Sequence, residues 1–127
     1  MNIKKIISIN TDTHKILLET NEAIITASSK EIYLMEILEV NKFVLYANNE
    51  KYMIQCYKDK YQDFILKVGF IQIHKNFAIN PNKISAFKIS TMELEIENQQ
   101  IITVNQKYKK NLLNYLNSFS IIQVQSI

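Results

Sequence analysis

The chain has 127 residues, 47% of them hydrophobic and 21% charged, which suits one globular domain with a substantial core and excludes a disordered chain. It contains one glycine, Gly69, which argues against phosphate-binding loops and dinucleotide-binding folds, because those sites need several glycines where the backbone approaches the ligand. All 15 basic residues are lysine. Residues 1–66 carry 8 lysines and 9 acids, whereas residues 67–127 carry 7 lysines and 3 acids. A polyanion would therefore be attracted to the second half of the chain.

Short strand patterns, separated by asparagine- and serine-rich turns, occupy the first half of the chain. Strands are expected at residues 3–9, 15–20, 23–27, 32–37, 43–47 and 51–56. The first two should pair as a hairpin across residues 10–13 and the last two across residues 48–50, because asparagine tolerates the backbone of tight turns. Residues 28–31 are expected to form a brief turn or helical cap.

Two segments have apolar residues at the spacing of an amphipathic helix. The first spans residues 58–68, and its apolar face consists of Tyr61, Phe64, Ile65 and Val68. The second spans residues 106–119, with Asn105 as its N-cap and a face made of Tyr108, Leu112, Tyr115, Leu116 and Phe119. Between them, strands are expected at residues 70–74, 77–80, 84–90, 92–97 and 101–104. This order lacks the regular alternation that builds a parallel sheet, so we expect a mainly β, antiparallel fold with two short helices.

Two polar segments of the basic half carry side chains that could contact nucleic acid. One is the turn His74-Lys75-Asn76 between two strands, and the other is Asn105-Gln106-Lys107 at the start of the last helix. Amide side chains can pair with adenine, and lysine can reach guanine acceptors or neutralise phosphate.

These segments resemble the signature regions of the LytTR family of bacterial DNA-binding domains. Residues 32–36 (IYLME) are similar to the family's Ile-x-Tyr-Ile-Glu-Ala strand, and Lys51-Tyr52 fits the tyrosine of the following hairpin. Residues 70–80 (FIQIHKNFAIN) are similar to Phe-x-Arg-x-His-Arg/Lys-Ser-Phe/Tyr-x-Val-Asn, and residues 105–108 (NQKY) stand where the family has Ser-Arg-Arg-Tyr. The departures are Gln72 and the Gln106-Lys107 pair in place of arginine, and Asn76 and Asn105 in place of serine.

The resemblance implies LytTR-like stacked antiparallel sheets over residues 23–119. Residues 1–22 are then an N-terminal extension, expected to be a β-hairpin packed on the domain. Residues 120–127 are a C-terminal extension whose alternating pattern predicts an extra strand, pairing with the N-terminal segment or with a second molecule.

The function that the resemblance implies is sequence-specific binding of double-stranded DNA by a bacterial transcription regulator, with loops entering successive major grooves at direct repeats. Carried over by position, the DNA-binding residues are Asn41, Lys42, His74, Lys75, Asn76, Asn105, Gln106, Lys107, Lys109 and Lys110. Some of these side chains have structural alternatives: His74 and Asn76, like Asn80, could hold turn backbone, and Lys109 and Lys110 could form the solvated face of a helix.

The implied partners are DNA, a second copy side by side on DNA, and a membrane-bound inhibitor protein. Because only about twenty residues precede the matched region, we expect a stand-alone regulator without a receiver domain.

No apolar run approaches the roughly 20 residues that span a bilayer, and no signal peptide is apparent, so we expect no membrane insertion and a cytoplasmic location. The single cysteine, Cys56, suits that compartment and a place in the core.

The sequence leaves one other function class open and argues against another. Because every arginine of the signature is replaced, the chain could be a divergent LytTR-like interaction module that does not read DNA. An enzyme is not expected, because no nucleophile–base motif and no metal-ligand spacing occurs, and we expect no cofactor or metal. Glu93, Glu95 and Glu97 alternate with apolar residues, which indicates the solvated face of a strand.

Overall fold

The computed structural model describes residues 3–39, 41–55 and 60–118 of the chain. The strands are β1 (Ile3–Asn10), β2 (Lys15–Glu19), β3 (Ile24–Ser28), β4 (Ile32–Glu39), β5 (Lys42–Ala47), β6 (Lys51–Gln55), β7 (Ile71–His74), β8 (Phe77–Ile79), β9 (Ile84–Lys88), β10 (Glu93–Ile96) and β11 (Ile101–Thr103). The α-helices are α1 (Lys60–Val68) and α2 (Lys109–Asn117), and short 3-10 turns are η1 (Ser29–Glu31), η2 (Pro81–Lys83) and η3 (Gln106–Tyr108).

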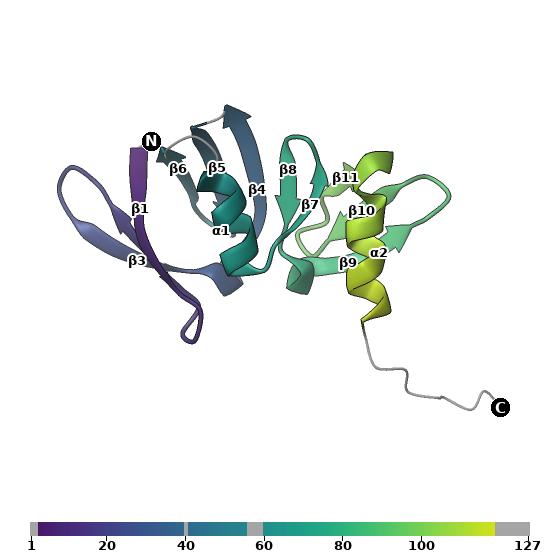
Figure 1. Cartoon of the computed structure of the whole chain (residues 1–127), viewed down its shortest axis with the longest axis horizontal. Helices are drawn as coiled ribbons and strands as arrows, with labels where there is room; N and C mark the ends of the chain where they lie inside the picture. Colours follow the sequence, from purple (N-terminus) through teal and green to yellow (C-terminus); the bar gives the residue numbers. More distant parts are fainter. Residues whose placement is uncertain (1–2, 40, 56–59, 119–127) are drawn as a thin grey trace.

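The strands form an eight-stranded sheet and a three-stranded sheet, and the single parallel ladder of the larger one divides it into two antiparallel parts, so that three antiparallel sheets follow one another along the molecule (Figure 1). The first has the order β3-β2-β1, the second β6-β5-β4-β8-β7, and the third β11-β10-β9. A short parallel ladder between β1 and β6 joins the first two sheets, with Ile3 opposite Met53. The predicted hairpins over residues 10–13 and 48–50 are both present, and the Asn10 side chain accepts the backbone N–H groups of Asp12 and Thr13, each at 3.0 Å.

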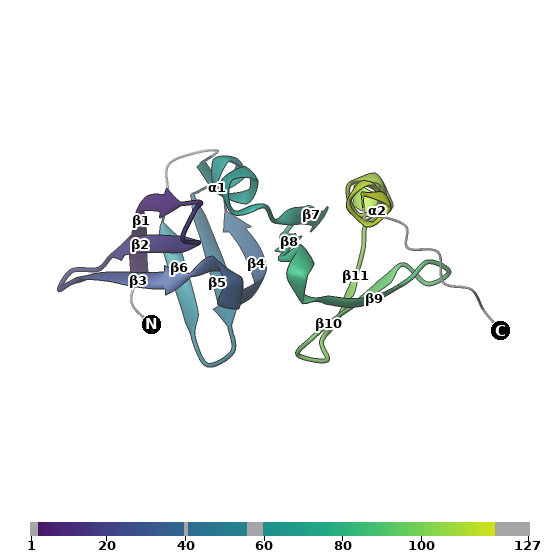
Figure 2. The same cartoon turned by 90° about the horizontal axis from the view of Figure 1, so that it is seen from below.

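Helix α1 covers one face of the second sheet (Figure 2). The ring of Phe64 in this helix packs against the ring of Phe43 in β5, with 5.2 Å between the ring centroids. The Phe64 ring also meets the Phe70 ring edge-on, with 6.2 Å between the centroids. The helix ends at Gly69, whose φ of +75° lets Phe70 N–H donate to Ile65 O at 3.0 Å. This is the Schellman arrangement, in which glycine takes the left-handed position. The only glycine of the chain therefore stops α1 and turns the chain into β7.

Two apolar cores lie on opposite sides of β4, which contributes Met35 to one and Leu34 to the other. The first core lies under α1 and includes Ile16, Leu18, Phe43, Leu45, Ile54, Phe64 and Ile65. The second joins β7 and β8 to the third sheet and α2, and includes Ile73, Ile79, Leu94, Ile96, Ile102, Val104 and Leu112. Because both faces of β4 are buried, its sequence is an almost continuous apolar run rather than an alternating one.

The structure shortens or divides several predicted elements. The strand expected at residues 84–90 ends at Lys88, because residues 89–92 form the turn to β10, where Met92 has a φ of +58°. The helix expected from residue 106 begins as the 3-10 turn η3 and becomes α-helical at Lys109. Cys56, Phe119 and the predicted strand in residues 120–127 lie outside the described residues. In the part of the chain that the structure describes, no helix is long and apolar enough to cross a membrane.

Candidate nucleic-acid interface

Three segments predicted to contact DNA lie at one edge of the molecule, the upper edge in Figure 1. They are the turn between β4 and β5, the turn between β7 and β8, and the chain entering α2 through η3, and together we call them the loop edge. Antiparallel pairing explains the first two, because β4 ends where β8 begins: Glu36 lies opposite Phe77, and Ile37 N–H donates to Asn76 O at 2.7 Å. The third is held there by Asn105 N–H, which donates to Ile73 O of β7 at 2.9 Å.

The turn between β7 and β8 is held by its own side chains. The backbone N–H of Asn76 donates to His74 Nδ1 at 3.1 Å, and the His74 ring lies 5.7 Å from the Phe77 ring. The turn-holding role considered for His74 is thus present, and because Nδ1 accepts here, a neutral ring carries its proton on Nε2. Lys75, at the tip of the turn, is exposed.

The entrance to α2 presents the largest group of predicted contacts. Asn105 caps η3 as expected, because its Oδ1 accepts Lys107 N–H at 2.9 Å. Gln106, Lys107 and Lys110 are exposed and Lys109 is half-buried. The Lys107 ammonium lies 5.6 Å from the centroid of the Tyr108 ring, a cation–π distance that steadies the long side chain without neutralising its charge.

The turn between β4 and β5 is less basic. Asn41 and Lys42 are both half-buried, and Lys42 is the first residue of β5 rather than part of a free loop. It lies opposite Glu39 in the ladder, so an acid accompanies the lysine at this tip. Coulomb repulsion from a carboxylate weakens phosphate binding nearby, so this segment should contribute least to a polyanion site.

A second acid near the loop edge, Glu36, accepts a hydrogen bond from a tyrosine. Tyr46 OH donates to Glu36 Oε1 at 2.6 Å. Burial, followed by this hydrogen bond, raises the pKa of Tyr46 to about 12, so the phenol stays protonated and keeps donating at neutral pH.

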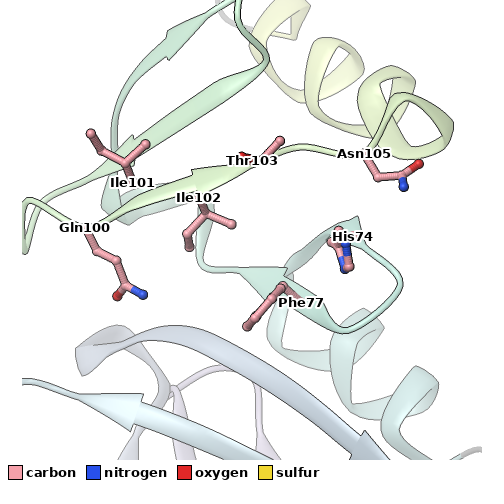
Figure 3. Close-up of a pocket in the computed structure, with 7 residues that line it drawn as sticks. All are labelled: His74, Phe77, Gln100, Ile101, Ile102, Thr103 and Asn105. Atoms are coloured by element: carbon pink, nitrogen blue, oxygen red, sulfur yellow. The ribbon is translucent and has the colours of Figure 1, made fainter.

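A shallow depression of about 390 Å³ separates the turn between β7 and β8 from β11 (Figure 3). Its lining residues are His74, Phe77, Gln100, Ile101, Ile102, Thr103 and Asn105. Figure 3 shows His74 and Asn105 on facing segments, so the depression connects two parts of the loop edge. Among the described residues, no group of three His, Cys, Asp or Glu side chains is placed to hold a metal ion.

Two polar residues have structural roles at this edge that sequence patterns did not reveal. Gln72 Nε2 donates to the carbonyls of His74 and Lys75, at 3.2 and 3.3 Å, and Asn111 Nδ2 of α2 donates to Gln72 O at 3.4 Å. In the sequence, Gln72 was conspicuous only as a replacement for arginine, and nothing distinguished Asn111.

A sequence model described as the LytTr DNA-binding domain matches residues 22–117. The solved LytTr DNA-binding domain of a Bacillus cereus protein, titled as a methyl-accepting/DNA response regulator, is similar with a TM-score of 0.60 and 21% identity, covering 84% of this chain and 98% of that one. This likeness confirms the expected fold of stacked antiparallel sheets with two short helices. No curated protein is significantly similar in sequence.

Proposed function

Because the chain belongs to the LytTR family of DNA-binding domains, we propose that it is a bacterial transcription regulator that binds double-stranded DNA sequence-specifically through its loop edge. One observation carries this proposal: segments around residues 41, 75 and 106, far apart in the sequence, lie at the same edge and bring lysine and amide side chains there. The family is one of DNA-binding domains.

The chemistry of the loop edge fits separate positioning and reading roles. Lys75, Lys107 and Lys110 are exposed and would neutralise phosphates, which sets affinity and its dependence on salt. Exposed amides of Asn76 and Gln106 can form paired hydrogen bonds with adenine in the major groove, each worth about 1–3 kcal/mol of discrimination. Asn105 uses its Oδ1 as a helix cap, so a base contact from this residue would use its Nδ2 group.

The wider arrangement in the cell is part of the same proposal. The protein would bind direct repeats in the cytoplasm, with a second copy side by side on the DNA, and a membrane-bound protein would hold it inactive. The two direct repeats would be separated by a whole number of DNA helical turns. Each turn is about 34–36 Å long, and this spacing puts both protein copies on the same face of the duplex.

The test is fluorescence anisotropy with duplex DNA from upstream of its own gene, against a scrambled duplex of the same composition, over a series of salt concentrations. We expect the native duplex to bind about 10³-fold more tightly or better, as specific sites commonly do. The logarithm of the affinity should fall steeply with the logarithm of salt concentration, by about 0.9 for each phosphate neutralised.

The second candidate is the interaction module that keeps this fold without reading DNA. It is favoured by the absence of arginine from the chain, because lysine lacks the planar fork that binds guanine in two places. Weak binding, equal for the two duplexes, would establish this candidate and contradict the regulator proposal.

A further inference from the structure

Gln72 lies on β7, two residues before the turn that carries Lys75. Its side chain is half-buried and points into the turn, where Nε2 donates to the carbonyl oxygens of His74 and Lys75, at 3.2 and 3.3 Å. A primary amide has two N–H donors, so it can serve both carbonyls at once. These bonds occupy the donor group that would otherwise be offered to DNA.

The backbone of the same strand is bonded to the entrance of α2. Gln72 O accepts Asn111 Nδ2 at 3.4 Å, and the next carbonyl, that of Ile73, accepts Asn105 N–H at 2.9 Å. Ile73 is fully buried in the second core, which fixes this part of β7. The side chain of Gln72 therefore ties the turn to a strand whose backbone also holds the entrance to α2.

We propose that Gln72 is a positioning residue, which holds the β7–β8 turn so that the Lys75 ammonium meets a DNA phosphate. This inference rests on the proposed function. The arginine usual at that place in the family would bring a charge of its own, whereas Gln72 is neutral and acts through Lys75.

The test is the salt dependence of DNA binding by Gln72→Met. Methionine has a similar length and no donor, so both bonds to the turn are lost while the net charge is unchanged. We expect the affinity to fall about five- to 150-fold, the range for two neutral hydrogen bonds. We also expect the salt slope to fall by about 0.9, as it should for Lys75→Ala, because a displaced Lys75 no longer neutralises its phosphate.

Matched variants separate positioning from direct contact and from general instability. Gln62→Met makes the same chemical change at an exposed position on α1 and should leave both affinity and slope unchanged. Gln72→Asn keeps the amide on a side chain one methylene too short to serve both carbonyls, and should lower the slope as Gln72→Met does. The double variant Gln72→Met/Lys75→Ala should bind no more weakly than Lys75→Ala.

The outcomes distinguish this inference from the proposed function. A wild-type protein without sequence-selective, salt-dependent binding would contradict the proposed function itself. If the wild type binds and Lys75→Ala lowers the slope, a slope unchanged in both Gln72 variants would overturn the positioning role, as would losses that simply add in the double variant. Thermal melting of each variant shows whether a weaker affinity comes only from a smaller folded fraction.

Discussion

Asn80 illustrates how one buried polar residue organises this fold. With Ser29, it is one of two polar side chains buried among the described residues. Its Nδ2 donates to Ile32 O at 2.7 Å and to Ser29 O at 3.3 Å, and its Oδ1 accepts Asn82 N–H at 3.1 Å. The side chain thereby joins the start of β4 to the turn after β8. The opposite ends of β4 and β8 carry parts of the loop edge. The structural role considered for Asn80 from the sequence is confirmed.

Replacing Asn80 should therefore destabilise the protein. Asn80→Ala removes the donor to Ile32 O and leaves Ser29 O with the backbone N–H of Ile32, and a buried carbonyl that loses its donor costs about 1–3 kcal/mol. We expect urea denaturation to show a loss of this size or larger. Asn98→Ala is the control, because Asn98 holds an exposed turn at Gln100 N–H where water can replace it. Equal, small losses in the two variants would contradict the role assigned to Asn80.

The elements show which features a sequence can predict. The hairpin across residues 10–13 could be predicted, because alternation and an asparagine that caps the turn are both local signals. The split of the last helix into η3 and α2 could not, because Asn105 is a good cap for either kind of turn, and its N–H bond to Ile73 O is a tertiary contact that leaves no local pattern. Gln72 was missed for a similar reason: its partners are backbone carbonyls, which leave no pattern in side-chain identity.

Gly69 provides a prediction at the scale of the element, because it ends α1. A Cβ at this position would meet no atom within 4 Å, so Gly69→Ala should cause no clash. The cost comes from the φ of +75°, a left-handed backbone that disfavours side chains by about 1–2 kcal/mol. We expect urea denaturation to show that loss for Gly69→Ala and a smaller one for Gly69→Asn, since asparagine tolerates this conformation better. Unchanged stability of Gly69→Ala would show that the turn relaxes without cost.

At the scale of the whole molecule, the stacking of sheets brings distant segments to one edge. The pairing of β4 with β8 joins residues more than forty positions apart, and the parallel contact of β1 with β6 joins residues fifty apart. Neither pairing has a local signal, so the sequence alone predicted strands without their neighbours, and the resemblance to a family supplied the shared edge. The division into residues 1–22, 23–119 and 120–127 stays a prediction, although β2 contributes the buried Ile16 and Leu18 to the first core.

The stacking of the sheets also determines which lysines lie at the loop edge. Lys75 and Lys107 belong to the loop edge, whereas Lys30 lies in η1, which precedes β4 and so stands at the opposite end of that strand. All three side chains are exposed, so their removal should change the net charge equally and the DNA contact unequally.

The measurement that tests the DNA-binding edge most directly is therefore the salt slope of binding to the upstream duplex for Lys75→Ala, Lys107→Ala, their double variant and Lys30→Ala. We predict that each loop-edge lysine removes about 0.9 from the slope, that the double variant loses both increments, and that Lys30→Ala keeps the wild-type slope. Equal slopes for the double variant and Lys30→Ala would contradict the assignment of the loop edge as the DNA-binding surface.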